Sequence, residues 1–182
     1  ERFERAITAE AENRIAALDD LRMKAGDQWN PQARAKRAAE QRPCLTINKL
    51  PTFCHQIEND LKQNRPAISV TAVGDGASKH TAQILKGLIR EIERRSTAEV
   101  AYGSGVGGAI SNGWGYWRLI TEYESEDSFD QVISIRRVRN PFTVYLDPNR
   151  QQPDGSDAMW GFVTEMIPRS EYERRWPKAD KM

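Results

Sequence analysis

The hydrophobic pattern of the chain changes its period near residue 114, and this change constrains the fold more than any other feature. Before it, apolar residues recur at three- and four-residue spacings, which is typical of amphipathic helices. After it, apolar and polar residues alternate, which is typical of half-exposed strands. Helices followed by strands, rather than a regular alternation of the two, indicate an α+β fold. We therefore predict amphipathic helices followed by a mostly antiparallel sheet with a hairpin.

The helical half also contains one short stretch of strand-like alternation. Ile68, Val70 and Ala72 alternate with polar residues, so we predict a strand over residues 67–72. Apolar spacing with start and stop signals predicts helices over residues 3–24, over 31–41 and from an Asn48 N-cap to a stop at 64–66. An apolar stripe predicts a helix over 78–96, and residues 97–112 have the length of a further helix.

In the second half of the chain, alternating apolar residues predict strands over residues 117–123 and 132–138, joined as an antiparallel hairpin with an acidic tip. Shorter strands over 144–146 and 159–166 and a terminal helix over 169–176 follow. We divide the chain into a helical segment (1–49), a helix-rich body with one strand (50–113) and an antiparallel β region with the terminal helix (114–182). All three are expected to belong to one domain of a longer protein.

Composition excludes several classes of protein. Lys and Arg number 27 against 26 Asp and Glu, so a net charge of +1 argues against a strongly basic nucleic-acid binder. With Cys44 and Cys54 as the two cysteines, a secreted disulfide scaffold is excluded. The charge-free stretch over residues 100–117 is rich in glycine and contains polar residues, which makes it a poor membrane span, and we expect no membrane partner.

Residues 103–108 match the G-x-G-x-x-G pattern of dinucleotide-binding loops. That interpretation needs a strand directly before the glycines, whereas a long helix is predicted there. We favour close packing of a glycine-rich helix, with Gly103 and Gly107 as packing or interface candidates. A nucleotide-binding enzyme that uses this segment is the alternative.

No catalytic, cofactor or metal set emerges from the other polar residues. Cys44, Cys54, His55 and His80 lack the spacing of a tetrahedral zinc site. The acidic residues between Asp147 and Asp157 do not follow the calcium-loop pattern, and whether this loop binds a cation is left open.

Two groups of side chains are candidates for contacts with partners. Arg136, Arg137 and Arg139 form the densest basic patch, which suits nucleic acid or an acidic protein surface. The simpler interpretation is a solvated face paired with the opposite strand. Trp29, Trp114 and Trp117 are candidates for core packing or a subunit interface.

The chain also resembles a known family through the order of its short phrases, which span nearly its whole length. These phrases are GDQW (26–29), RPCLTINK (42–49), KQNRP (62–66), GWGYWR (113–118), EDSFDQ (126–131), RNPFTVYLDP (139–148) and FVTE (162–165). In this order they resemble the N-terminal part of portal proteins, the head-to-tail connectors of short-tailed bacteriophages. The glycine run at 103–108 departs from the bulkier residues expected in that family.

The resemblance implies a structural subunit without enzymatic activity or cofactor. It implies a dodecameric ring at the portal vertex of the virion capsid, assembled in the host bacterial cytoplasm, through which double-stranded DNA passes during packaging and ejection. The implied protein partners are the major capsid protein, the scaffolding protein, the terminase large subunit and tail adaptor proteins. Within such a subunit, this chain would correspond to the wing region.

Overall fold

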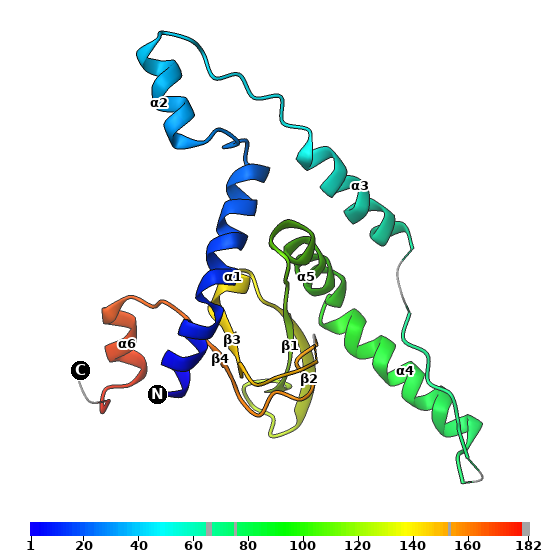
Figure 1. Ribbon diagram of the computed structural model, residues 1–182. Coiled ribbons are helices and arrows are strands. Elements are labelled where there is room, and N and C mark those ends of the chain that lie inside the picture. The colour runs from blue at the N-terminus through cyan, green and yellow to red at the C-terminus, as the bar shows by residue number, and fades with distance from the viewer. Residues whose placement is uncertain (65–66, 75, 153, 180–182) are drawn as a thin grey trace. The chain divides into compact units, whose positions relative to one another are not determined.

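A computed structural model describes residues 1–64, 67–74, 76–152 and 154–179. Helices dominate the first part of the chain and short antiparallel strands the second, which confirms the predicted α+β class (Figure 1). The elements are α1 (Arg2–Lys24), α2 (Pro31–Ala39), α3 (Leu50–Gln63), α4 (Lys79–Arg95), α5 (Ala98–Asn112), β1 (Trp117–Tyr123), β2 (Gln131–Arg137), the 3-10 helix η1 (Pro141–Thr143), β3 (Val144–Leu146), β4 (Gly161–Val163) and α6 (Arg169–Arg175).

The starts of the helices follow local capping chemistry. The Ser78 side chain accepts a hydrogen bond from the backbone N–H of His80 at 3.2 Å, which fixes the start of α4. The prediction for α3 was wrong by one residue, because Lys49 and not Asn48 occupies the N-cap position. The Asn48 side chain instead accepts from the Leu50 N–H and donates to the Lys24 carbonyl at 2.7 Å, and so links the end of α1 to the start of α3.

The strand predicted over residues 67–72 is absent, since residues 67–73 have no regular secondary structure. Ile68 is 48% exposed and Val73 is 85% exposed. Alternation shows that a segment can present two different faces, but a strand also needs a partner for its backbone hydrogen bonds. Among the described residues, the paired strands are β1 with β2 and β3 with β4. α3 ends at Gln63 with Asn64 at its C-cap, where the predicted stop begins. Residues 65–66 of that stop lie outside the described residues.

The predicted hairpin is confirmed. β1 and β2 pair antiparallel from Trp117 opposite Arg137 to Tyr123 opposite Gln131. β3 and β4 also pair antiparallel, with Val144 opposite Val163. The strand predicted over residues 159–166 is limited to Gly161–Val163, because β3 offers only three residues for it to pair with.

Backbone contacts divide the chain into two compact units. The first joins both ends of the chain, residues 1–11 and 142–182, and the second contains residues 12–141. In the first unit, the Phe3 ring meets Tyr145 edge-on at 4.9 Å and Phe162 at 5.5 Å. The division of the sequence at residues 49 and 113 stays a prediction.

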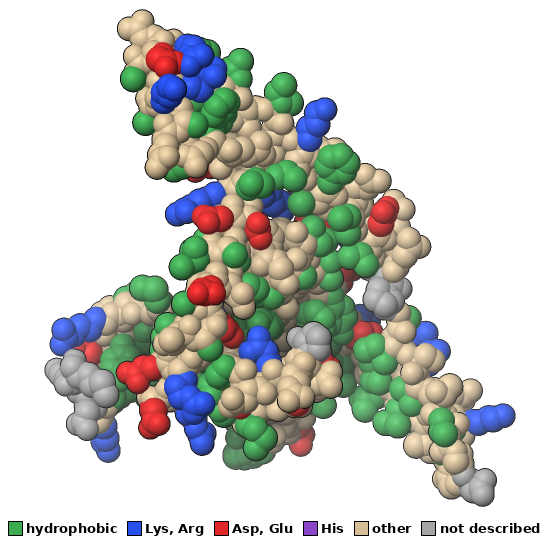
Figure 2. Space-filling view, in the orientation of Figure 1, with side chains coloured by type: hydrophobic (Ala, Val, Ile, Leu, Met, Phe, Trp, Pro, Cys, Tyr) green, Lys and Arg blue, Asp and Glu red, His purple; other side chains and the backbone are tan. Residues whose placement is uncertain are grey.

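The buried core consists mainly of small side chains. Its apolar members are Ala6, Ala17, Ala82, Ala98, Ala101, Ile135 and Val144. Larger apolar residues of the helices remain exposed, with Phe53 of α3 at 61% and Leu88 of α4 at 53%. Figure 2 shows such side chains at the surface over α3 and α4. The apolar stripes that predicted these helices are therefore left largely uncovered by the described residues.

Candidate functional site

The glycine-rich helix α5 approaches the start of β1 at backbone distance. A Cβ atom added to Gly105 would lie 2.7 Å from Cε3 of Trp117, and one added to Gly108 would lie 2.9 Å from the Trp114 carbonyl oxygen. A Cβ at Gly115 would collide with the carbonyl oxygen of Gly105. Close helix–strand packing therefore explains why this helix carries so many glycines. Because residues 103–108 lie inside α5, they do not form a phosphate-binding loop.

The two glycines proposed as interface candidates are placed differently. A Cβ on Gly103 would meet nothing within 4 Å, and one on Gly107 would lie 3.6 Å from Oε1 of Glu58. Their role at an interface stays a prediction. The glycines that approach β1 belong to a stripe that the sequence contains but that we did not predict. Small residues recur at three- and four-residue spacings at Ala98, Ala101, Gly105, Gly108 and Asn112.

The junction between α4 and α5 holds β2 in place. Ala98 and Ala101 pack with Ile135, and Ile92 and Tyr102 lie against this cluster. The Ser96 hydroxyl oxygen accepts a hydrogen bond from the Ile135 N–H at 3.0 Å. Burial raises the pKa of the Tyr102 phenol, and the hydrogen bond that the phenol donates to Glu93 raises it further.

The three candidate tryptophans differ in their surroundings. Trp117 is 47% exposed and meets the Tyr102 ring edge-on at 5.2 Å. Trp114 is half-buried, and its carbonyl accepts a hydrogen bond from the Asn112 side chain. Trp29 is also half-buried, with the Arg37 guanidinium 5.0 Å from its ring centre, and its indole N–H donates to the Leu45 carbonyl. An interface role for any of the three stays a prediction.

The basic patch on β2 is divided between paired and unpaired arginines. Arg136 donates from Nε and Nη2 to the two carboxylate oxygens of Glu122 at 3.0 and 2.7 Å. These bonds hold the pKa of the Glu122 carboxyl below its usual value and raise the pKa of Arg136. Arg137 and Arg139 are exposed, and within the described part of the chain neither guanidinium makes a hydrogen bond or an ion pair.

The opposite end of the hairpin is acidic and ordered by its own hydrogen bonds. The Glu124 N–H donates to the Asp130 carbonyl at 2.8 Å, and the Asp130 N–H donates to the Ser128 hydroxyl. Glu124 also pairs with Arg95 at 3.5 Å. Phe129 stands 94% exposed at this end, beside a shallow hollow that Glu126 helps to line.

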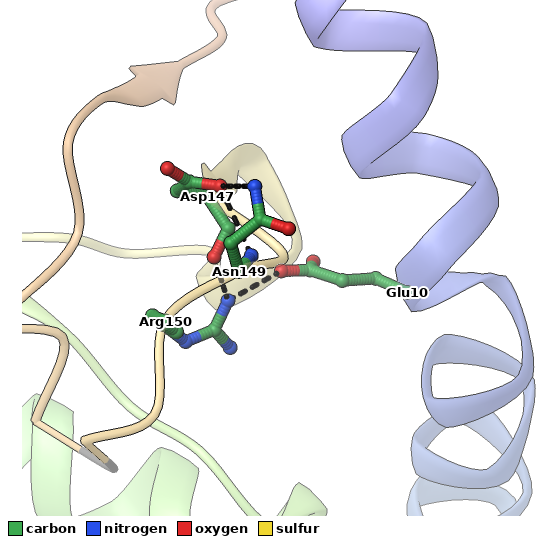
Figure 3. A network of polar contacts seen from close by, with 4 residues as sticks. All are labelled: Glu10, Asp147, Asn149 and Arg150. Carbon is green, nitrogen blue, oxygen red and sulfur yellow. Dashed lines mark hydrogen bonds and ion pairs between the residues drawn. The ribbon is translucent and has the colours of Figure 1, made fainter.

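The other polar cluster lies in the first unit (Figure 3). Arg150 Nη1 pairs with Glu10 of α1 at 3.4 Å and also donates to the Asp147 carbonyl. The Asp147 carboxylate is buried and accepts two hydrogen bonds from Asn149. The Arg150–Glu10 pair joins α1 to the loop that follows β3, and the other contacts order the loop itself.

The loop in which a cation was considered uses its carboxylates to bind backbone amides. Amides of Gln151 and Gln152 donate to Asp157, which lowers the pKa of that carboxyl, and the amide of Ser156 likewise lowers the pKa of Asp154. Residue 153 of this loop lies outside the described residues. Within the described ranges, no group of three or more His, Cys, Asp or Glu residues is arranged to hold a metal ion. In those same ranges, no helix is both long and apolar enough to cross a membrane.

The geometry therefore describes a structural segment with a packed helix–hairpin unit, an uncovered apolar surface and charged hairpin ends. Residues 1–182 match the profile of the family described as "Phage P22-like portal protein", and the chain belongs to this family. It is also 26% identical over 187 residues to the "Portal protein" of Acyrthosiphon pisum secondary endosymbiont phage 1, across 97% of this chain. The chain spans 26% of the length of that relative. The resemblance to phage portal proteins is thus confirmed.

Proposed function

We propose that this chain is part of the wing region of a portal subunit, which assembles with further copies into a dodecameric ring at one vertex of a phage capsid. The observation that carries the proposal, beside membership of the family, is the uncovered apolar surface of the second unit. Phe53 of α3 is 61% exposed, Leu88 of α4 is 53% exposed and Leu119 of β1 is 68% exposed.

Further exposed apolar side chains lie on α3, α4 and the hairpin. Exposed apolar side chains that gather in this way mark protein contacts. Neighbouring subunits and the rest of the subunit itself are the surfaces that would cover them.

In this proposal the ring is a conduit for double-stranded DNA during packaging and ejection, and it has no chemistry of its own. The net charge of +1 suits a conduit, because a strongly basic wall would hold the phosphate backbone and slow its passage. The ring would dock the major capsid protein, the scaffolding protein, the terminase large subunit and the tail adaptors. It would assemble in the host cytoplasm and remain in the virion.

Native mass spectrometry of the full-length protein tests the proposal. A closed assembly of twelve subunits is expected, and it should persist on dilution because obligate interfaces are extensive. A protein that stays monomeric at every concentration would contradict the proposed ring. A melting temperature that rises on addition of NAD or ATP would instead support the nucleotide-binding alternative.

A further inference from the structure

One face of the β1–β2 hairpin is apolar and only partly covered by α5. Trp117, Leu119 and Tyr123 alternate along β1, so they share this face. On β2, Ile135 lies opposite Leu119 and Ile133 lies opposite Thr121, so both add to the same face. Ile135 is buried against α5, whereas Leu119 is 68% exposed and Tyr123 is 61% exposed. Phe129 continues the uncovered surface beyond the strands. An apolar strip of this kind is typical of a protein contact.

The charges at the two ends of the hairpin decide what kind of partner fits. We name Glu126, Asp127, Phe129 and Asp130 the hairpin tip, and Trp117, Leu119, Arg137 and Arg139 the hairpin base. At the base, Arg137 lies opposite Trp117 in the register, so a basic residue and an exposed indole share one face of the hairpin. At the tip, carboxylates stand next to an exposed phenyl ring.

The two ends cannot neutralise each other within one copy. Six residue steps separate the ends of β1, which correspond to about 20 Å at the rise of a strand. That distance exceeds the Debye length of about 8 Å at physiological salt. In the described part of the chain, the carboxylates of Glu126, Asp127 and Asp130 make no ion pair.

We propose that the hairpin tip of one copy docks on the hairpin base of the next copy, with Phe129 against Trp117 and Leu119 and the tip carboxylates against Arg137 and Arg139. The two surfaces are complementary. Each has an exposed apolar side chain, and the negative charge of the tip matches the positive charge of the base. DNA does not fit the tip, because carboxylates repel phosphate. In this proposal, Arg137 and Arg139 contact the acidic tip of the neighbouring copy.

This contact rests on the proposed ring and makes it more specific. Tip and base are different surfaces, so the contact is heterologous, and repeating it builds a ring when the rotation between copies closes, rather than a two-fold dimer. Each subunit would then use its base toward one neighbour and its tip toward the other.

Charge reversal in the full-length protein tests the contact. A tip variant carries Glu126→Lys, Asp127→Lys and Asp130→Lys, and a base variant carries Arg137→Glu and Arg139→Glu. Each variant alone places like charges together, so we expect subunit association to weaken at least about tenfold, measured by native mass spectrometry and sedimentation. Mixed in equal amounts, the two variants should assemble again as rings that alternate them, with equal numbers of each. A single chain with all five substitutions should also assemble.

Controls separate this contact from the ring itself. Lys36→Glu reverses a charge on α2, outside the hairpin, and should leave assembly unchanged. Circular dichroism checks that each variant is folded. Phe129→Ser should weaken assembly, whereas Val73→Ser, at another exposed apolar residue, should not.

If both charge variants form normal rings, the hairpin contact is overturned but the proposed ring stands. The same holds if the base variant assembles normally but loses binding to duplex DNA. A wild-type protein that never assembles would overturn both.

Discussion

Gly105 and Gly115 show how strongly single residues determine the packing of α5 on β1. The carbonyl oxygen of Gly105 occupies the space that a Cβ on Gly115 would need, and an obstacle of backbone cannot rotate away as a side chain can. Gly103 lies two residues before Gly105 in α5, but a Cβ added to it would meet no atom within 4 Å. The two kinds of glycine therefore predict opposite effects of the same substitution.

Gly115→Ala should destabilise the packing of α5 against β1 by about 1–3 kcal/mol, because the added methyl group forces the helix and the strand apart. Gly103→Ala should stabilise α5 by about 0.5–1 kcal/mol, because alanine loses less backbone entropy in a helix. Hydrogen exchange of the α5 amides in the full-length protein measures both. Equal exchange rates in the two variants would contradict the close approach.

The ion pair between Glu122 and Arg136 predicts a pH effect with a definite sign. The hydrogen bonds from Arg136 hold the pKa of Glu122 below the ordinary value of 4.5, so the stabilisation is present above pH 4.5 and is lost as the pH falls through the lower, folded-state pKa. In an Arg136→Gln variant, the pKa of Glu122 should rise back toward 4.5. NMR titration of the Glu122 carboxyl measures it, and Arg137→Gln serves as the control because Arg137 does not bond to Glu122. An unchanged pKa in Arg136→Gln would argue against the ion pair in solution.

At the scale of elements, the helix junction and the hairpin depend on each other through one side chain. Ser96→Ala leaves the Ile135 N–H without its acceptor in a buried position, so we expect a loss of about 1–3 kcal/mol in local stability. The matched control is Ser104→Ala, whose exposed hydroxyl bonds only to the Val100 carbonyl of its own helix. Exchange rates of the β2 amides should rise in the first variant and not in the second.

The elements also show what sequence can predict. α4 and the β1–β2 hairpin were predicted because their signals are local: a helical stripe for α4, and alternation on either side of a polar tip for the hairpin. α5 was predicted from the length of its segment. The strand over residues 67–72 was predicted wrongly because pairing depends on a partner elsewhere, which alternation does not reveal.

For the candidate site, the sequence indicated that the glycines of α5 allow a close approach but not which of them do so. That depends on the rotation of the helix, and the spacing of Ala98, Ala101 and Gly105 carried the missing signal. The Ser96–Ile135 bond spans 39 residues, and nothing in the local sequence around Ser96 indicates it.

At the scale of the whole molecule, the first unit is built from both ends of the chain. Residues 1–11 contribute Phe3, Ala6 and Glu10 to it, and residues 142–179 contribute the aromatic and polar groups that they meet. Each part lacks a core of its own, since the rings of Phe3, Tyr145 and Phe162 come from both.

Deletion of residues 1–11 from the full-length protein should therefore increase hydrogen exchange throughout residues 142–179 while residues 12–141 stay protected. The reason is that β3 and β4 are too short to be stable as an isolated pair. Phe3→Ala keeps α1 and its ion pair between Glu10 and Arg150, so it should give a smaller increase in hydrogen exchange over residues 142–179. Loss of protection in the second unit as well would contradict its independence.

Because the first unit needs both ends of the chain, it also sets an order of events during synthesis. Residues 12–141 lie between its two parts, and a ribosome adds about 5–20 residues per second, so Phe3 waits on the order of ten seconds before Tyr145 is made. During that interval the second unit can fold on its own contacts while the first turns of α1 present an unmet aromatic ring. The nascent chain therefore offers a binding site for a chaperone around Phe3, and translation of the β3–β4 region removes it.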